Sequence, residues 1–198
     1  MKVGMIFESG PQGADKMVCE HIAKQLCPGI VISSATHVNK PDMIADCGKD
    51  VVNLMKEGCR RILIIWDLFP PWRGKDGRPC RKEDRLAILK SLKQAGMAKA
   101  PVFLICIREE LEAWLLADGR ALSAHLSTPE HQVKVKSEKN PDSVSNPKGC
   151  IKRIFQRNRR GKYNDLVHAI KIIRKLPDLE HLRKSDSFSR FEEKLTGE

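Results

Sequence analysis

Residues 61–67 read Arg-Ile-Leu-Ile-Ile-Trp-Asp, a continuous apolar run that ends on an acid. Isoleucine favours extended backbone, and an uninterrupted apolar run of this length is typical of a strand that is covered on both faces of a parallel sheet. The stretch therefore predicts an α/β fold with this strand near its centre. It also places Asp67 at the point where that strand ends.

Other segments of the first two-thirds of the chain carry the same kind of signal. Apolar runs predict three further strands, at residues 3–7, 30–34 and 102–107. Helical periodicity predicts four helices between or after them, at about residues 15–26, 41–56, 82–94 and 109–122. Strands that alternate with helices imply parallel crossover connections, with helices on both faces of a mostly parallel central sheet. In the third helix Leu86, Leu89 and Leu92 are expected to face inward.

A long loop, residues 68–81, separates the central strand from the next helix and is rich in Pro, Gly and charge. Loops of this length in compact domains are often functional. Arg73, Lys75 and Arg78 could hold phosphates there. Trp72 could either stack on a base or cover the edge of the sheet, and the sequence leaves both interpretations open.

Charge divides the chain unevenly. Residues 131–184 hold 15 Lys and Arg against 5 Asp and Glu, so they carry +10 of the total formal charge of +11. We expect an α/β domain over residues 1–126, a polar linker or loop over 127–147, and a basic helical region over 148–198 that packs on the α/β core. Such asymmetry is common in proteins that contact phosphate backbones, although a solvated helical surface would also explain it.

Bulk composition excludes several classes of protein. With 41% hydrophobic and 31% charged residues, the chain has the balance of a folded globular protein. No apolar run approaches the roughly 18 residues needed to span a bilayer, and no signal peptide is expected. The seven cysteines are odd in number and form no CxxC pair. This pattern favours a reducing compartment, so we expect a cytoplasmic protein with no membrane partner.

Three acids follow predicted strands and are the candidate catalytic and metal-binding residues. Glu8 follows the first strand, Asp67 the central one, and Glu112 comes shortly after the strand at 102–107. Open α/β sheets bind their ligands at the carboxyl ends of their strands. Carboxylates that converge there could hold Mg²⁺ or Mn²⁺, because such hard cations prefer oxygen ligands. On a basic chain, this pattern indicates metal-assisted chemistry on a polyanion.

Several short motifs resemble those of DUF4276, a family of uncharacterised bacterial proteins. The most distinctive is Glu-Ala-Trp-Leu-Leu-Ala-Asp at residues 112–118. Glu8 and Asp67 after their strands, Asn-Pro-Lys at 146–148, the tyrosine at 163 and Ser-Phe-Ser-Arg-Phe at 187–191 add to the resemblance. Proteins of this group are similar to Toprim domains, the fold of topoisomerases, primases and overcoming-lysogeny-defect nucleases. The resemblance implies a Toprim-like, that is Rossmann-like, sheet.

The same resemblance implies roles for individual residues. Glu8 would be a general acid or base near the scissile phosphate, Asp67 a Mg²⁺ ligand, and Glu112 a further carboxylate of the metal cluster. The implied reaction is metal-dependent phosphodiester hydrolysis, and the implied setting is anti-phage defence beside a partner ATPase. Basic residues of the C-terminal region would grip the nucleic acid, which we expect to be DNA, without reading its bases: Lys148, Lys152, Arg153, Arg159, Arg160 and Lys162.

One departure from the Toprim pattern favours a second interpretation. Toprim proteins typically carry an Asp-x-Asp pair after the third strand, whereas here Phe69 stands at the second acidic position. Asp76, Glu83 or Asp84 could replace that acid from the loop and the helix that follows. If none does, the protein is a non-catalytic nucleic-acid-binding or assembly module with a degenerate acidic site. A phosphotransferase or phosphohydrolase that acts on small molecules is a third possibility, which the large basic region disfavours.

Overall fold

The computed structural model describes residues 1–71 and 78–197, which form two compact units. The first unit comprises Met1–Ile107 and the residues from Phe191 onward, and the second comprises Arg108–Arg190. The division differs from the boundaries expected at residues 126 and 147, because the helices after residue 108 pack with those of the basic region.

The first unit contains one four-stranded sheet in which all paired strands are parallel. Its order is β2-β1-β3-β4, with β1 at Lys2–Phe7, β2 at Val31–Thr36, β3 at Arg61–Asp67 and β4 at Val102–Ile107. Helices α1 (Ala14–Leu26), α2 (Lys40–Lys56) and α3 (Arg81–Gln94) connect the strands in turn. This confirms the predicted α/β class, a parallel sheet flanked by helices, and it is consistent with a Rossmann-like fold.

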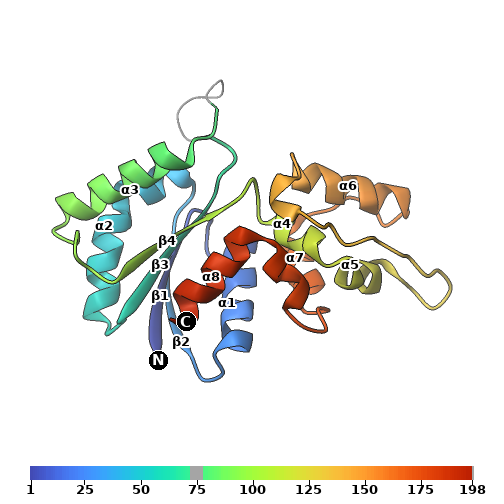
Figure 1. Ribbon diagram of the computed structural model, residues 1–198, viewed down its shortest axis with the longest axis horizontal. Helices are drawn as coiled ribbons and strands as arrows, with labels where there is room; N and C mark the ends of the chain where they lie inside the picture. Colours follow the sequence, from blue (N-terminus) through green and yellow to red (C-terminus); the bar gives the residue numbers. More distant parts are fainter. Residues whose placement is uncertain (72–77, 198) are drawn as a thin grey trace. The chain divides into compact units, whose positions relative to one another are not determined.

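Helices cover both faces of the sheet (Figure 1). On one face α2 and α3 lie over a core that includes Ile6, Ile64 and Trp66. On the other face lie α1 and the last part of α8 (Asp186–Thr196), which buries Phe191 and Leu195 completely. Because β1 and β3 have helices on both sides, their side chains are apolar in almost every position.

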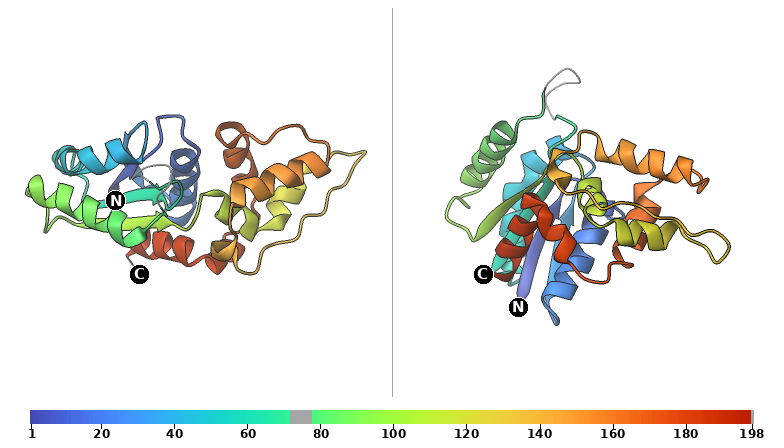
Figure 2. Two further views of the ribbon diagram at one scale, coloured as in Figure 1. Left: turned by 90° about the horizontal axis from the view of Figure 1, so that it is seen from above. Right: turned by 45° about the vertical axis from the view of Figure 1, so that its right-hand side comes forward.

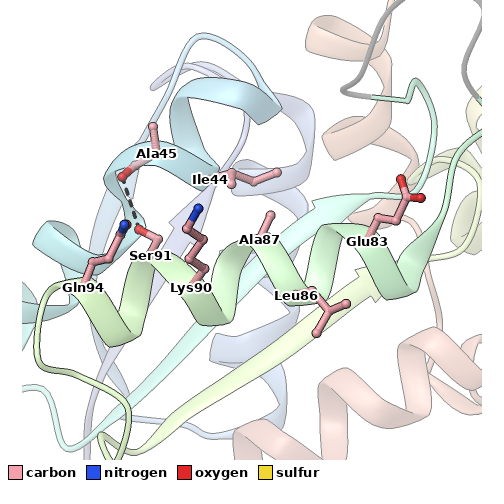
Figure 3. Close-up of a pocket in the computed structure, with 8 residues that line it drawn as sticks. All are labelled: Ile44, Ala45, Glu83, Leu86, Ala87, Lys90, Ser91 and Gln94. Atoms are coloured by element: carbon pink, nitrogen blue, oxygen red, sulfur yellow. Dashed lines mark hydrogen bonds between the residues drawn. The ribbon is translucent and has the colours of Figure 1, made fainter.

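A shallow hollow of about 460 Å³ lies between α2 and α3, where Ser91 Oγ donates to the carbonyl of Ala45 at 3.2 Å (Figure 3). Leu86 lines this hollow and is 57% exposed, and Leu89 is 41% exposed. The expectation that both face inward is therefore wrong, whereas it is right for Leu92. Asp84, Ile88 and Ser91 also face inward, so two polar residues lie on the face where the sequence predicted a stripe of leucines.

The second unit is helical. Its helices are α4 (Glu112–Ala117), α5 (Gly119–Leu126), α6 (Pro147–Arg157) and α7 (Asp165–Ile173), with short 3-10 turns at Pro141–Ser143 and Glu180–Lys184 and the first residues of α8. Trp114 is fully buried in its core; the indole Nε1 donates to Ser187 Oγ at 2.9 Å, and the ring meets Phe188 edge-on. The second unit thus has an apolar core of its own.

The helix expected over residues 109–122 is interrupted at Asp118. This residue takes an extended conformation, and its carboxylate accepts a hydrogen bond from the backbone N–H of Arg120 at 2.8 Å, which caps α5. Its side chain is completely buried and also pairs with the guanidinium of Arg120. Asp118 is therefore a buried capping residue between two helices. A capping Asp and a Gly follow the apolar stripe directly, and that was the signal for a new helix.

Residues 127–140 leave α5, turn back and run alongside it (Figure 2). Ser123 Oγ accepts from the N–H of Val135 at 2.8 Å, and Ser137 Oγ accepts from the N–H of Gly119 at 2.9 Å. These bonds hold an otherwise irregular segment against the helix.

Among the described residues, no helix combines the length and apolar character needed to cross a bilayer. All seven cysteines are free thiols.

Candidate functional site

Glu8 and Asp67 meet at the carboxyl ends of β1 and β3, which are neighbours in the sheet. The carboxylate oxygen Oε1 of Glu8 accepts a hydrogen bond from the backbone N–H of Asp67 at 2.8 Å. Parallel strands expose such groups together at one edge, which is where open α/β sheets bind ligands. The structure therefore brings together two of the three acids that the sequence singled out.

Glu8 is half-buried, and its carboxyl group has several charged neighbours. Burial raises the pKa of Glu8 to about 7, and the nearby carboxylates of Asp15 and Asp84 act in the same direction. The ammonium group of Lys40 and the hydrogen bond from Asp67 oppose that rise. A carboxyl group with this pKa can hold or release a proton near neutral pH.

Lys40 is a member of this site that sequence reasoning missed. It is only 4% exposed, and its Nζ donates to the carbonyls of Leu68 at 2.9 Å and Pro70 at 2.8 Å. It thereby ties the start of α2 to the chain just after Asp67. A signal was present, because a lysine in the first turn of a helix opposes the helix dipole and indicates another partner for its charge.

Asp84 lies on α3 and is 1% exposed. Its Oδ2 accepts a hydrogen bond from the indole Nε1 of Trp66 at 3.0 Å and lies 3.7 Å from Nζ of Lys40. Burial raises the pKa of Asp84, and Lys40 and Trp66 oppose that rise. Asp84 therefore holds α3 and Lys40 in place. Glu83 is exposed on α3, and Asp76 lies outside the described residues.

The loop after β1 completes the surroundings of Glu8. Ser9 Oγ donates a hydrogen bond to the carboxylate of Asp15, in the first turn of α1. Gly13 lies against Ser9, and a Cβ on this glycine would overlap the serine hydroxyl at 1.7 Å. Close packing of this loop thus explains the glycine and keeps Asp15 near enough to influence Glu8.

The residues present fit one mode of Mg²⁺ binding and not another. Among the described residues, no group of three or more His, Cys, Asp or Glu side chains gathers into a metal cage. Mg²⁺, however, commonly binds through one or two carboxylates, keeps several waters, and takes further oxygens from substrate phosphates. Glu8 and Asp67 supply the two carboxylates for that mode. A cluster of all three predicted acids stays a prediction.

Glu112 belongs to the second unit and sits in a network of its own. It is 2% exposed, its Oε1 accepts a hydrogen bond from the hydroxyl of Tyr163 at 3.1 Å, and Nζ of Lys148 lies 3.9 Å away. Burial raises the pKa of Glu112 to about 7, Lys148 opposes that rise and Glu110 adds to it. Lys148 Nζ also pairs with Asp165 at 2.7 Å, so this predicted phosphate-binding lysine already has two acidic neighbours.

The other predicted nucleic-acid contacts fall into three groups. Arg73 and Lys75, together with Trp72, lie outside the described residues. Five further predicted contacts have exposed side chains: Arg78, Lys152, Arg153, Arg159 and Lys162. Arg160 is half-buried, and its Nη2 reaches Thr128 Oγ1 at 3.4 Å, which ties it to the end of α5.

The fold and this edge define an α/β protein with Rossmann-like topology and an acidic site at the carboxyl ends of its two central strands. Residues 12–196 match the family described as Domain of unknown function (DUF4276), and the chain belongs to that family. Asp67 and Glu112 lie within the matched residues, and Glu8 precedes them. No curated protein and no solved structure matches the chain.

Motif residues that carry the family resemblance meet in the second unit, although they are far apart in the sequence. Glu112, Lys148 and Tyr163 form one cluster. Trp114 and the Ser187-Phe188 pair form another, beside Asp142, whose carboxylate accepts from the N–H of Ser187 at 3.1 Å. These contacts give the motifs a structural role in that unit.

Proposed function

We propose that this protein is a metal-dependent nuclease that hydrolyses phosphodiester bonds at the carboxyl ends of β1 and β3. The observation that carries the proposal is the contact between Glu8 and Asp67, which places two carboxyl-bearing residues at the ligand-binding edge of a parallel sheet. The Toprim-like relation implied by the sequence motifs points to the same reaction and forms part of the proposal.

Each residue of the site has a proposed role. Asp67 would supply oxygen ligands for the cation, and Glu8 would hold or release a proton beside the scissile phosphate. Lys40 would position Asp67, because it binds the carbonyls that follow it. When bound, Mg²⁺ or Mn²⁺ supplies an activated water and neutralises charge that develops on phosphorus.

The proposed substrate is DNA, and the proposed setting is the cytoplasm. The basic charge of residues 131–184 supports a polyanionic substrate, and seven free cysteines suit a reducing compartment. The sequence resemblance extends the proposal to anti-phage defence and to a partner ATPase. Assays of the isolated chain should therefore be repeated with a co-expressed ATPase.

Cleavage of plasmid DNA by site variants tests the proposal. We expect Glu8→Gln and Asp67→Asn to lower the Mn²⁺-dependent cleavage rate by at least about 100-fold, the loss typical of a general acid–base group or metal ligand. Asp46→Asn is the matched control, since it also neutralises one acid of this unit at a side chain that is 45% exposed. Calorimetric titration with Mn²⁺ should show weaker binding for the two site variants only.

Wild-type rates of cleavage in Glu8→Gln and Asp67→Asn would contradict the proposal. Glu112→Gln decides whether the third acid belongs to the reaction. A loss of cleavage and of Mn²⁺ affinity as large as that of Asp67→Asn would place Glu112 in the metal cluster. Unchanged cleavage would restrict Glu112 to the network that it forms with Tyr163 and Lys148.

A second candidate function is a non-catalytic nucleic-acid-binding or assembly module. Two observations favour it: Phe69 stands where Toprim proteins carry a second acid, and Asp84 is engaged by Trp66 and Lys40. Under this function, the wild-type chain would bind DNA in Mg²⁺ and Mn²⁺ without cleaving it. The same plasmid assay therefore separates the two candidates.

A further inference from the structure

A cavity of about 490 Å³ lies in the second unit, between α6 and the extended segment that runs along α5. Its charged lining is strongly one-sided, with four cations against the single acid Glu138: Lys134, Lys136, Arg153 and Arg157. Only Arg153 was a predicted contact for nucleic acid. The cavity therefore groups residues that the sequence had not connected.

Two regular patterns build this cavity. On α6, Cys150, Arg153 and Arg157 recur at helical spacing and share one face with Ile154. Along the extended segment, exposure alternates: residues 134, 136 and 138 are exposed, residue 133 is buried, and residues 135 and 137 are half-buried. The cations therefore converge from two separate stretches of backbone.

The extended wall is held firmly in place. Glu138 N–H donates to the carbonyl of Leu116 at 2.9 Å, and the bonds of Val135 and Gly119 to serine hydroxyls add two further anchors. On the opposite wall, Nη2 of Arg153 donates to Sγ of Cys150 at 3.0 Å, which orients the guanidinium group. Contacts within the unit thus hold both walls that carry the cations.

Among the described residues, these four cations have no acidic partners of their own. In the part of the chain that the structure describes, no carboxylate pairs with any of the four, whereas Lys148 in the same unit pairs with Asp165. Like charges that converge in this way repel one another, and they attract anions. Arginine and lysine are also the residues that most often bind phosphate oxygens.

We propose that this basic cavity binds the sugar-phosphate backbone of a nucleic-acid strand. The inference deepens the proposed function and rests on it for the choice of DNA. The apolar part of the lining is aliphatic, with Leu116, Val135 and Ile154 and no aromatic ring among the described lining residues. Such a wall offers no stacking platform for a base, so recognition is expected through phosphate charge and not through sequence.

Salt dependence of DNA binding tests the inference. Affinity for a labelled 20-base-pair duplex would be measured by fluorescence anisotropy in EDTA. The wild type would be compared with two double variants. One carries Lys134→Gln and Lys136→Gln, and the other carries Arg153→Gln and Arg157→Gln. Each pair is expected to weaken binding at least about tenfold and to reduce the slope of log K against log salt by about 1.8, or 0.9 per lost phosphate contact. Lys171→Gln with Arg174→Gln, at exposed positions in the last turn of α7 and directly after it, removes the same charge outside the cavity and should change neither value.

Protection of Cys150 gives a second readout that does not depend on the variants. This half-buried thiol lines the cavity, so bound DNA should slow its alkylation by iodoacetamide, followed by peptide mass spectrometry. Cys27, half-buried in the first unit, is the control and should react at the same rate with and without DNA. The rate of Cys150 alkylation is also measured with tripolyphosphate and with a mononucleotide in place of DNA.

The outcomes separate this inference from the proposed nuclease. Unchanged salt slopes, or protection of Cys150 by tripolyphosphate but not by DNA, would overturn the inference even if the chain cleaves DNA. Protection by DNA together with reduced slopes in both double variants would support it. That result would stand even if Asp67→Asn had no effect on cleavage, because binding is measured without metal.

Discussion

Lys40 illustrates how a single charged residue can organise a site. Its ammonium group is buried, and a buried charge is costly unless several partners compensate it. Two carbonyl oxygens and Asp84 supply that compensation, and the same contacts fix the chain just beyond Asp67. The geometry at the end of β3 is therefore maintained by a residue that is remote in sequence and lies on a helix.

Glu112 allows a prediction at the same scale. Its pKa of about 7 exceeds the value of 4.5 for an unperturbed glutamate, so the folded chain holds the proton more tightly than the unfolded chain. As pH rises from about 4.5 to 7 the unfolded chain alone loses its proton, and the free energy of unfolding falls by up to about 3 kcal/mol. Glu112→Gln should lack this decrease.

Urea unfolding between pH 4 and 8, in EDTA, measures the effect. The variant should gain stability relative to the wild type as pH rises through that window, and the gain should level off above about pH 7. Glu130→Gln, at an exposed position of the same unit, is the control and should follow the wild-type curve. A constant difference between Glu112→Gln and the wild type at every pH would contradict the prediction.

At the scale of elements, the packing of the extended segment on α5 depends on Gly119. A Cβ on this residue would lie 2.3 Å from the carbonyl oxygen of Val135 and 2.7 Å from the carbonyl carbon of Lys136, both of them backbone atoms. Gly119 N–H also donates to Ser137. The first turn of α5 therefore accepts only glycine while the segment stays in place.

Gly119→Ala should destabilise the chain by about 1–3 kcal/mol, the usual cost of overpacking. Because Lys134 and Lys136 lie on the displaced segment, the substitution should also weaken DNA binding. Gly10→Ala is the control, since a Cβ there meets nothing within 4 Å. Urea unfolding and anisotropy titrations check both effects, and equal stability of the two variants would show that the segment shifts at no cost.

At the scale of the whole chain, the last helix returns to the first unit. The guanidinium of Arg61 donates to the carbonyl of Lys194 at 2.7 Å, which joins residues separated by 133 positions. Phe191 and Leu195 are completely buried there. The core of the first unit is therefore complete only when residues that follow the second unit in the sequence have packed on the sheet.

Phe191→Ala should lower the free energy of unfolding by about 3–5 kcal/mol, the range for removing a buried phenylalanine. Glu193→Ala, at an exposed position of the same helix, should cost little. Urea unfolding monitored by circular dichroism compares the two variants. A loss below about 1 kcal/mol for Phe191→Ala would mean that the end of α8 contributes little to the core.

Sequence patterns predicted the strands and most helices of the first unit to within one or two residues, because hydrophobic periodicity records which side chains leave water. They also predicted that Glu8 and Asp67 would share an edge, since parallel strands end together. They were less successful on α3 and at Asp118. In both places a buried carboxylate with a specific partner displaced the simple apolar pattern.

By itself, the sequence determined the α/β class, the order of the elements along the chain, the family and the concentration of basic charge in the last third. These properties follow from local periodicity, motifs and composition. Only the tertiary structure decided the strand order, the role of Lys40, the meeting of Glu112 with Tyr163, and the gathering of four cations around one cavity. Those features depend on contacts between residues distant in sequence, and no local pattern records which distant group will satisfy a buried charge.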